Sequence, residues 1–144
     1  MNKLQKSLAA GALTTALVLA SSANAELAIV VNPDYSGGNI NMQDIRDLYQ
    51  GKSKTLNDVQ VKAVDQSSGS SARKQFLSTV LEKSESEMNR YWSRLIFSGK
   101  GRPPEVLDSA DAIKRWIALN PEGIGYIDAD DVDDTVKVLL KVTQ

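Results

Sequence analysis

The 144-residue sequence contains no cysteine and no histidine. Their absence excludes disulfide frameworks, zinc fingers, Ser-His triads and any chemistry based on a thiolate or an imidazole. An excess of one charge is also missing, because 17 basic residues face 18 acidic residues and the formal net charge is -1. Nucleic-acid-binding proteins are usually strongly basic, so no nucleic-acid partner is expected. The chain must work with carboxylates, hydroxyls, amides, lysine and arginine, and we expect neither a cofactor nor a metal.

The first 25 residues have the organisation of a secretory signal peptide. Lys3 and Lys6 precede an uncharged apolar run over residues 8–20, and an Ala-x-Ala site follows at residues 23–25. The run is shorter than the roughly 20 apolar residues that a membrane span needs. We therefore expect cleavage after Ala25 and a periplasmic location, with an uncleaved membrane anchor as the alternative.

The remaining residues, 26–144, are expected to form one domain. A chain of this size buries roughly two thirds of the surface that its unfolded form exposes. That is enough for one hydrophobic core, but not for two lobes with a cleft between them.

The spacing of apolar residues predicts strands and helices that alternate along this domain. Strands are expected over residues 27–31, 59–64, 123–127 and 136–142. Helices are expected over residues 72–81 and after the N-caps Asn41, Ser84 and Ser109. Residues 65–71 are predicted to form a loop, and Trp92 and Trp116, on apolar helical faces, are expected in the core. This alternation predicts an α/β domain with a mixed, largely parallel sheet flanked by helices.

The polar loop after the second expected strand is the candidate binding site. It leads into a helix, whose first backbone N–H groups have no intrahelical partner and lie at the positive end of the helix dipole. An anion is the ligand that such a helix start binds. The candidate residues are Ser68, Gly69, Ser70 and Ser71, with Arg73 able to donate to two oxygens of one anion. The alternative is a capped helix after a glycine turn, without a ligand.

Two other segments carry weaker signals. In the loop at residues 99–102, Lys100 and Arg102 could reach an anion, but the loop lacks the third glycine of a dinucleotide fingerprint. The aspartates of residues 128–134 resemble part of a calcium loop, but Val132 occupies a ligand position. A solvated acidic turn is therefore the preferred interpretation of that segment.

Three segments, in the same order along the chain, resemble the substrate-binding proteins of phosphate ABC transporters, which belong to the periplasmic-binding-protein class. Residues 45–52 are similar to a helix that this family ends with an aromatic-x-Gly-Lys string. Residues 61–76 are similar to its strand, Ser-Gly-Thr or Ser-Gly-Ser loop, and helix. Residues 120–127 are similar to its Pro-Gly-Ala-Ile-Gly-Tyr-Val string. Family members have two lobes, and this chain resembles mainly the second.

By position, Ser68, Gly69 and Ser70 match the oxyanion-binding Ser-Gly-Thr of that family. The family also has an arginine shortly before this serine, where the present sequence has Val64 and Asp65. The resemblance implies a single periplasmic-binding-protein-like lobe over residues 26–144. Its implied function is to bind inorganic phosphate or a similar oxyanion for a membrane transporter, without catalysis.

A single lobe offers an anion few contacts, so we expect weak binding unless a second copy of the chain or a different protein adds a second surface. The alternative function is a periplasmic interaction or sensory accessory protein with a degenerate ligand site, docking onto a membrane sensor, transporter or porin. A carboxylate hydrolase is a third interpretation, but the sequence does not place two acids in one cleft.

Overall fold

The computed structural model describes residues 25–143, so residues 1–24 of the predicted signal peptide lie outside the described residues. The strands are β1 (Glu26–Val31), β2 (Thr55–Leu56), β3 (Val59–Gln60), β4 (Lys62–Gln66), β5 (Glu105–Leu107), β6 (Gly123–Asp128) and β7 (Lys137–Thr143). The helices are α1 (Met42–Tyr49), α2 (Ser71–Phe76), the π-helical turn η1 (Leu77–Leu81), α3 (Glu85–Phe97), α4 (Ala110–Leu119) and the 3-10 turn η2 (Ala129–Asp131). Within residues 25–143, none of the helices combines the length and the hydropathy that a membrane span requires.

Five strands form one mixed sheet in the order β5-β4-β6-β1-β7, and β2 and β3 form a separate hairpin. β4 pairs in parallel with β5 and with β6, whereas β1 is antiparallel to both of its neighbours, β6 and β7. Four of these five strands therefore run in one direction and only β1 opposes them. The prediction of an α/β fold with a mixed, largely parallel sheet is confirmed.

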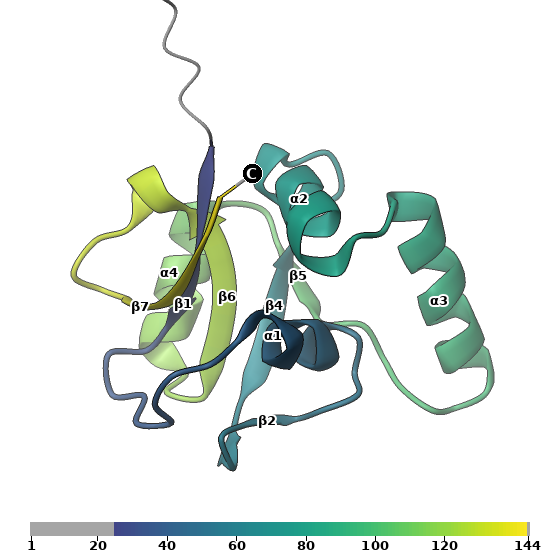
Figure 1. Cartoon of the computed structure of the whole chain (residues 1–144), viewed down its shortest axis with the longest axis horizontal. Coiled ribbons are helices and arrows are strands. Elements are labelled where there is room, and N and C mark those ends of the chain that lie inside the picture. Colours follow the sequence, from purple (N-terminus) through teal and green to yellow (C-terminus); the bar gives the residue numbers. More distant parts are fainter. Residues whose placement is uncertain (1–24, 144) are drawn as a thin grey trace, which may run out of the picture.

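Helices cover both faces of the sheet, as Figure 1 shows. Leu27 and Ile29 of β1 belong to the hydrophobic cluster that also contains the buried residues of α1 and α2. Ala28 and Val30, on the other face of the same strand, belong to the cluster of α4. Successive side chains of a strand point to opposite faces, so the uninterrupted apolar sequence of β1 fits a strand buried on both sides.

The three predicted N-caps are confirmed. Asn41 accepts the N–H of Asp44 at 3.0 Å, and the Asp44 carboxylate accepts the N–H of Asn41 at 2.8 Å, which completes a capping box. Ser84 and Ser109 each accept the N–H of the residue three positions later. These local bonds fix where α1, α3 and α4 begin.

The second predicted strand differs from the observed one. The expected strand over residues 59–64 is interrupted at Val61, and β4 continues to Gln66. This extension pairs with β5, a three-residue strand that the apolar pattern does not predict. Asp65 and Gln66, predicted to lie in a loop, are therefore buried strand residues.

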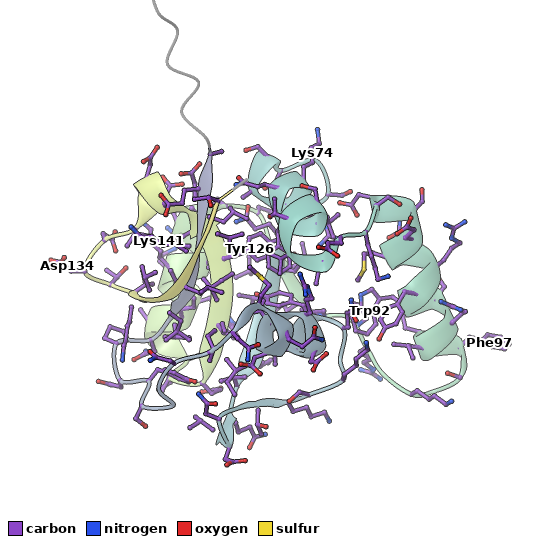
Figure 2. All side chains as sticks on the ribbon, in the orientation of Figure 1. Lys74, Trp92, Phe97, Tyr126, Asp134 and Lys141 are labelled. Atoms are coloured by element: carbon purple, nitrogen blue, oxygen red, sulfur yellow. The ribbon has the colours of Figure 1, made fainter. Side chains whose placement is uncertain are left out.

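Helix α3 stands apart from the sheet in Figure 1. Met88 is its buried residue, and Trp92 packs beside Gly51 but is only half-buried. Phe97 is 96% exposed and projects from the outer end of the helix in Figure 2. Trp116 in α4 is also half-buried, so the prediction that both tryptophans lie in the core is only partly met.

Candidate anion-binding site

The candidate site lies at the edge of the sheet where β4 ends. The parallel strands β4, β5 and β6 all end at this edge. Ligands of open α/β sheets bind outside the carboxyl ends of the strands. Residues 67–70 connect β4 to α2, which begins at Ser71. The predicted strand, loop and helix around the serines are therefore present.

Gly69 determines the shape of this turn. Its φ of +94° lies in the region that glycine adopts without steric cost, and apart from Gly69 and its two chain neighbours no described residue has an atom within 4 Å of a Cβ built on it. The amide of Ser70 donates to the carbonyl of Ser67 at 3.1 Å. Four neighbouring amides form no hydrogen bond with residues 25–143, and together we call them the amide nest: those of Ser68, Gly69, Ser71 and Ala72.

The hydroxyl of Ser70 is engaged inside the protein. It accepts the N–H of Arg73 at 3.2 Å as the N-cap of α2, and it donates to the side-chain oxygen of Gln66 at 2.7 Å. The Gln66 amide nitrogen in turn donates to the carbonyl of Tyr126 at 2.8 Å. Ser70 thus ties the start of α2 to strands β4 and β6. Ser68 and Ser71, by contrast, are exposed at the surface of the turn.

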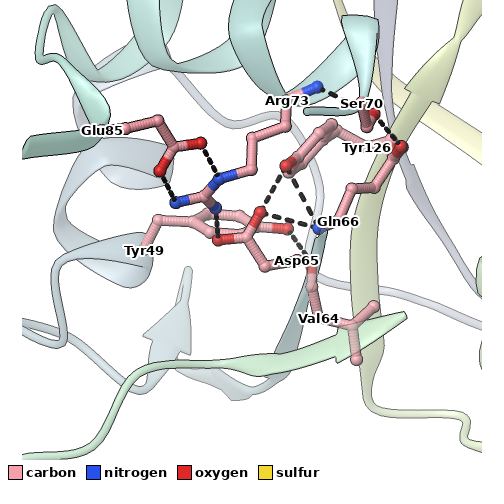
Figure 3. A network of polar contacts seen from close by, with 8 residues as sticks. All are labelled: Tyr49, Val64, Asp65, Gln66, Ser70, Arg73, Glu85 and Tyr126. Atoms are coloured by element: carbon pink, nitrogen blue, oxygen red, sulfur yellow. Dashed lines mark hydrogen bonds and ion pairs between the residues drawn. The ribbon is translucent and has the colours of Figure 1, made fainter. Parts of the chain in front are cut away.

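Arg73 is bound by two carboxylates, as Figure 3 shows. Its Nη1 lies 2.5 Å from Oδ2 of Asp65. Its Nε and Nη2 donate to the two carboxylate oxygens of Glu85 at 2.7 and 3.0 Å. The Arg73 side chain is 12% exposed. The two-oxygen contact that the sequence suggested for Arg73 is therefore made with a carboxylate of the protein itself.

The charges of this cluster stabilise one another. Burial alone would lower the pKa of Arg73, but its hydrogen bonds to Glu85 and Asp65 raise it above the ordinary value. The hydrogen bonds from Arg73 lower the pKa of Glu85, and the nearby Ser68 hydroxyl lowers it further. Because one cation faces two carboxylates, the cluster carries no surplus positive charge. An anion in the amide nest must therefore depend on the amides and on the exposed hydroxyl of Ser71.

Two buried phenols lie beneath the cluster. Tyr126 donates to Oδ1 of Asp65 and accepts the N–H of Gln66 at 3.2 Å. Tyr49 donates to the carbonyl of Val64 at 2.8 Å. Burial raises the pKa of both phenols above the ordinary value, and the neighbouring Asp65 carboxylate raises it further. Sequence reasoning missed these two tyrosines because they come from other elements, α1 and β6.

We predict that the free energy of unfolding falls as the pH rises above about 10. In the unfolded chain the phenols titrate near their ordinary pKa of about 10, whereas their pKa in the folded protein is higher. Their stabilising effect is complete below the unfolded pKa and is lost as the pH rises toward the folded pKa. Well above pH 10, each tyrosine costs about 1.4 kcal/mol per pH unit.

Denaturant unfolding of the wild type and Tyr126→Phe, followed from about pH 9 to about pH 11, checks this prediction. The variant should lose stability with a shallower slope than the wild type, because one of the three phenols with a raised pKa, those of Tyr35, Tyr49 and Tyr126, is gone. Equal slopes would contradict the assignment of alkaline sensitivity to Tyr126.

The aspartates of residues 128–134 stabilise their own turn. Asp128 accepts the N–H of Asp130 at 2.9 Å, and Asp133 accepts from Lys114 Nζ at 2.9 Å. Hydrogen bonds from Thr135 and Lys114 lower the pKa of Asp133 to about 2. In the part of the chain that the structure describes, no group of three or more potential metal-ligating acids is assembled.

Comparison with known proteins informs the fold. No family model matches the chain, and no curated protein matches it. An ABC-type phosphate transport receptor from Vibrio cholerae has a TM-score of 0.62 and 23% identity, over 80% of this chain and 46% of that chain. A protein described as a phosphate ABC transporter substrate-binding protein, from Clostridium perfringens and with bound phosphate, has a TM-score of 0.63 and 23% identity, over 80% and 45%. PstS from Borrelia burgdorferi has a TM-score of 0.59 and 15% identity, over 81% and 47%.

These likenesses define the class of fold. The matched part spans less than half the length of each of these proteins and most of the present chain. The resemblance predicted from the sequence is confirmed at the level of the fold, which is that of a single periplasmic-binding-protein-like lobe.

Proposed function

We propose that the chain is an exported module that binds inorganic phosphate or a similar oxyanion at the amide nest. The observation that carries the proposal is the group of four unengaged amides around Gly69, at the carboxyl edge of parallel strands. Such amides at a helix start attract anions. The fold supports the proposal, because solved proteins that share it are described as phosphate receptors, one of them with phosphate bound.

The five predicted residues divide into two roles in this proposal. The amides of Ser68, Gly69 and Ser71 donate to the anion, and the exposed hydroxyl of Ser71 adds a donor. Ser70 and Arg73 act through their contacts inside the protein, because Ser70 caps α2 and Arg73 joins β4 to Glu85. No residue is assigned a catalytic role.

Weak binding follows from the number of contacts. About four hydrogen bonds to a charged oxygen contribute roughly 6–12 kcal/mol in total. Immobilising the ligand costs roughly 4–15 kcal/mol, which offsets most of this gain. For one open lobe we expect a net binding free energy of about 4 kcal/mol, which corresponds to millimolar affinity. Tighter capture requires a second surface from another copy of the chain or from a different protein, such as a membrane transporter or sensor.

Export is part of the proposal because residues 1–25 have the charge pattern, apolar run and Ala-x-Ala site of a secretory signal. The lack of cysteine does not contradict export, since a domain of this size can be stable without disulfides.

Titration of the isotope-labelled protein with inorganic phosphate, followed by amide NMR at constant ionic strength, tests the proposal. We expect saturable shifts that centre on the amides of Ser68, Gly69, Ser71 and Ala72, with a dissociation constant of about 1 mM. Gly69→Ala should weaken binding about tenfold or more, because alanine is strained at this φ and the turn must change shape.

Gly38→Ala is the matched control. Gly38 also has a positive φ, +74°, and the nearest atom to a Cβ built on it lies 4.0 Å away. The Gly38→Ala substitution therefore imposes a similar backbone strain outside the nest, and it should leave the phosphate affinity unchanged. Shifts that grow without saturation, or equal losses of affinity in the two variants, would refute the nest and favour the alternative of a degenerate site in an interaction protein.

A further inference from the structure

A second concave surface lies at the opposite edge of the sheet. It has a volume of about 1100 Å³ and is bounded by α3, the loop that follows it, the segment after α1 and the beginning of β4. Its apolar lining comes from Leu48, Val61, Trp92, Ile96 and Pro104. A concave surface of this volume with an apolar lining is typical of a binding site.

Positive charge surrounds this apolar lining. Lys54, Lys62, Lys100 and Arg102 line the surface, and Glu122 is the carboxylate among its lining residues. None of the four cations forms an ion pair with a carboxylate of residues 25–143. We call this surface, with its apolar lining and these four cations, the basic groove.

The helix beside the basic groove ends in exposed apolar side chains. Of the residues of α3, Met88 is buried, while Ile96 is 54% exposed and Phe97 is 96% exposed. In Figure 2, Trp92 lies on the side of α3 that faces the rest of the molecule, and Phe97 points away from it. Large apolar side chains exposed next to a groove are typical of interaction sites.

The basic groove is separate from the amide nest. Lys62, at the beginning of β4, lines the groove, and the nest follows Gln66 at the end of the same strand. Four residue steps along a strand correspond to about 13 Å. The inference about the groove therefore does not depend on phosphate binding at the nest.

We propose that the basic groove binds an acidic segment of a partner protein. An apolar side chain of that segment packs on Trp92 and Ile96, and its carboxylates pair with the lysines and Arg102 along the groove. Charge complementarity selects this partner, because four cations that form no ion pair within residues 25–143 line an apolar surface, although Lys62 Nζ also lies 5.8 Å from the centroid of the Trp116 ring. The concave shape favours an inserted segment over a flat lipid surface.

A second copy of this chain fits the groove less well. Its own acidic turn, residues 128–134, has Val132 as its large apolar side chain, and Val132 is partly buried against the core cluster of α4. Lys114 also pairs with Asp133 of that turn. The acidic turn therefore offers no free apolar anchor for the groove.

The test uses a fluorescein-labelled dodecapeptide with a central Leu-Phe pair flanked by aspartate and glutamate, and the same peptide with lysine at every acidic position. Fluorescence anisotropy with the full chain should show the acidic peptide binding at least about tenfold tighter than the lysine peptide, with affinity falling as salt rises. Equal binding of the two peptides would overturn the proposal.

Two pairs of variants locate the binding surface. Lys100→Glu should weaken binding of the acidic peptide about tenfold, whereas Lys141→Glu, an equal charge change at an exposed position of β7 outside the groove, should alter its affinity less than about twofold. Ile96→Ser should weaken binding several-fold, and Leu119→Ser, at a side chain that is 83% exposed outside the groove, should not. Equal effects within either pair would overturn the assignment to the groove.

Two parallel measurements distinguish the other occupants. The first is sedimentation of the protein with phosphatidylcholine–phosphatidylglycerol vesicles. If the wild type sediments with the vesicles, Lys100→Glu does not, and the acidic peptide fails to bind, the groove binds a lipid surface in place of a protein segment. Concentration-dependent self-association in sedimentation velocity, abolished by Lys100→Glu, would show a second copy. Either result would overturn the proposal, whereas a monomer that ignores vesicles and binds the acidic peptide supports it.

Discussion

Replacing Arg73 by methionine should lower the free energy of unfolding by about 3 kcal/mol. The guanidinium and Asp65 are each 12% exposed, so removing the cation leaves a carboxylate buried without its charged partner. Breaking a buried ion pair in this way costs roughly 3–5 kcal/mol, and the bonds that Asp65 keeps to Tyr126 and Gln66 place the loss near the lower limit. In a domain of this size the melting temperature should fall by about 10 °C.

Arg115→Met and the double variant Asp65→Asn/Arg73→Met are the controls for this prediction. Arg115 lies exposed on α4, so its loss should change the free energy of unfolding by no more than about 0.5 kcal/mol. The double variant removes both charges and should recover at least half of the lost stability, because no buried charge remains unpaired. A stable Arg73→Met single variant would show that the ion pair is not structural.

The same variant separates two roles of Arg73. As a direct ligand of an anion, Arg73 would affect the phosphate affinity and not the stability when replaced. As a residue that holds α2 in place, it would affect the stability first. Its contacts with Asp65 and Glu85 favour the second role, and chemical denaturation together with the phosphate titration measures both quantities in one protein.

The elements that sequence reasoning predicted correctly are those with a local cause. The branched apolar run of β1 has the composition of a strand buried on both faces, and Asn41 with Asp44 defines the start of α1 within four residues of sequence. The turn at Gly69 is equally local, because glycine and the Ser70 cap occur together before a helix. For these elements, neighbours along the chain contain most of the information.

The polar residues at the end of β4 show why the rest could not be predicted. Asp65 and Gln66 are polar and precede a serine-rich stretch, so their local pattern indicates a loop. Their burial is compensated by Arg73, eight residues from Asp65, and by Tyr126, about sixty residues away. Because the compensating groups come from other elements, no local pattern distinguishes these buried polar residues from a solvated turn.

For helix α3, sequence reasoning predicted more burial than the structure shows. Its apolar residues recur at helical spacing, which predicts a face packed on the core. The structure packs only part of this face on the core: Met88 is buried and Trp92 is half-buried against the core cluster, whereas Ile96 borders the basic groove. Periodicity therefore predicted the helix and its apolar side correctly, but it could not specify whether the sheet or another protein covers that side.

The second large effect concerns Phe76, whose replacement by alanine should lower the free energy of unfolding by about 4 kcal/mol. Phe76 is fully buried, and its ring stacks on Tyr126 with centroids 4.0 Å apart. It also meets the edge of Tyr49 at 4.7 Å. Alanine would remove the contacts of α2 with both rings and leave a cavity beneath the start of the helix. Thermal and denaturant unfolding measure the loss.

Phe97→Ala is a matched control, because it makes the same chemical change in a side chain that is 96% exposed. It should alter the free energy of unfolding by less than about 0.5 kcal/mol. At temperatures where the Phe76→Ala variant remains folded, it should also bind phosphate more weakly than the wild type. The short helix α2, which carries part of the amide nest, would lose its packing on the rings of Tyr126 and Tyr49. Similar stabilities of the two alanine variants would show that the aromatic cluster does not hold α2 against the sheet, and the nest would then need another source of rigidity.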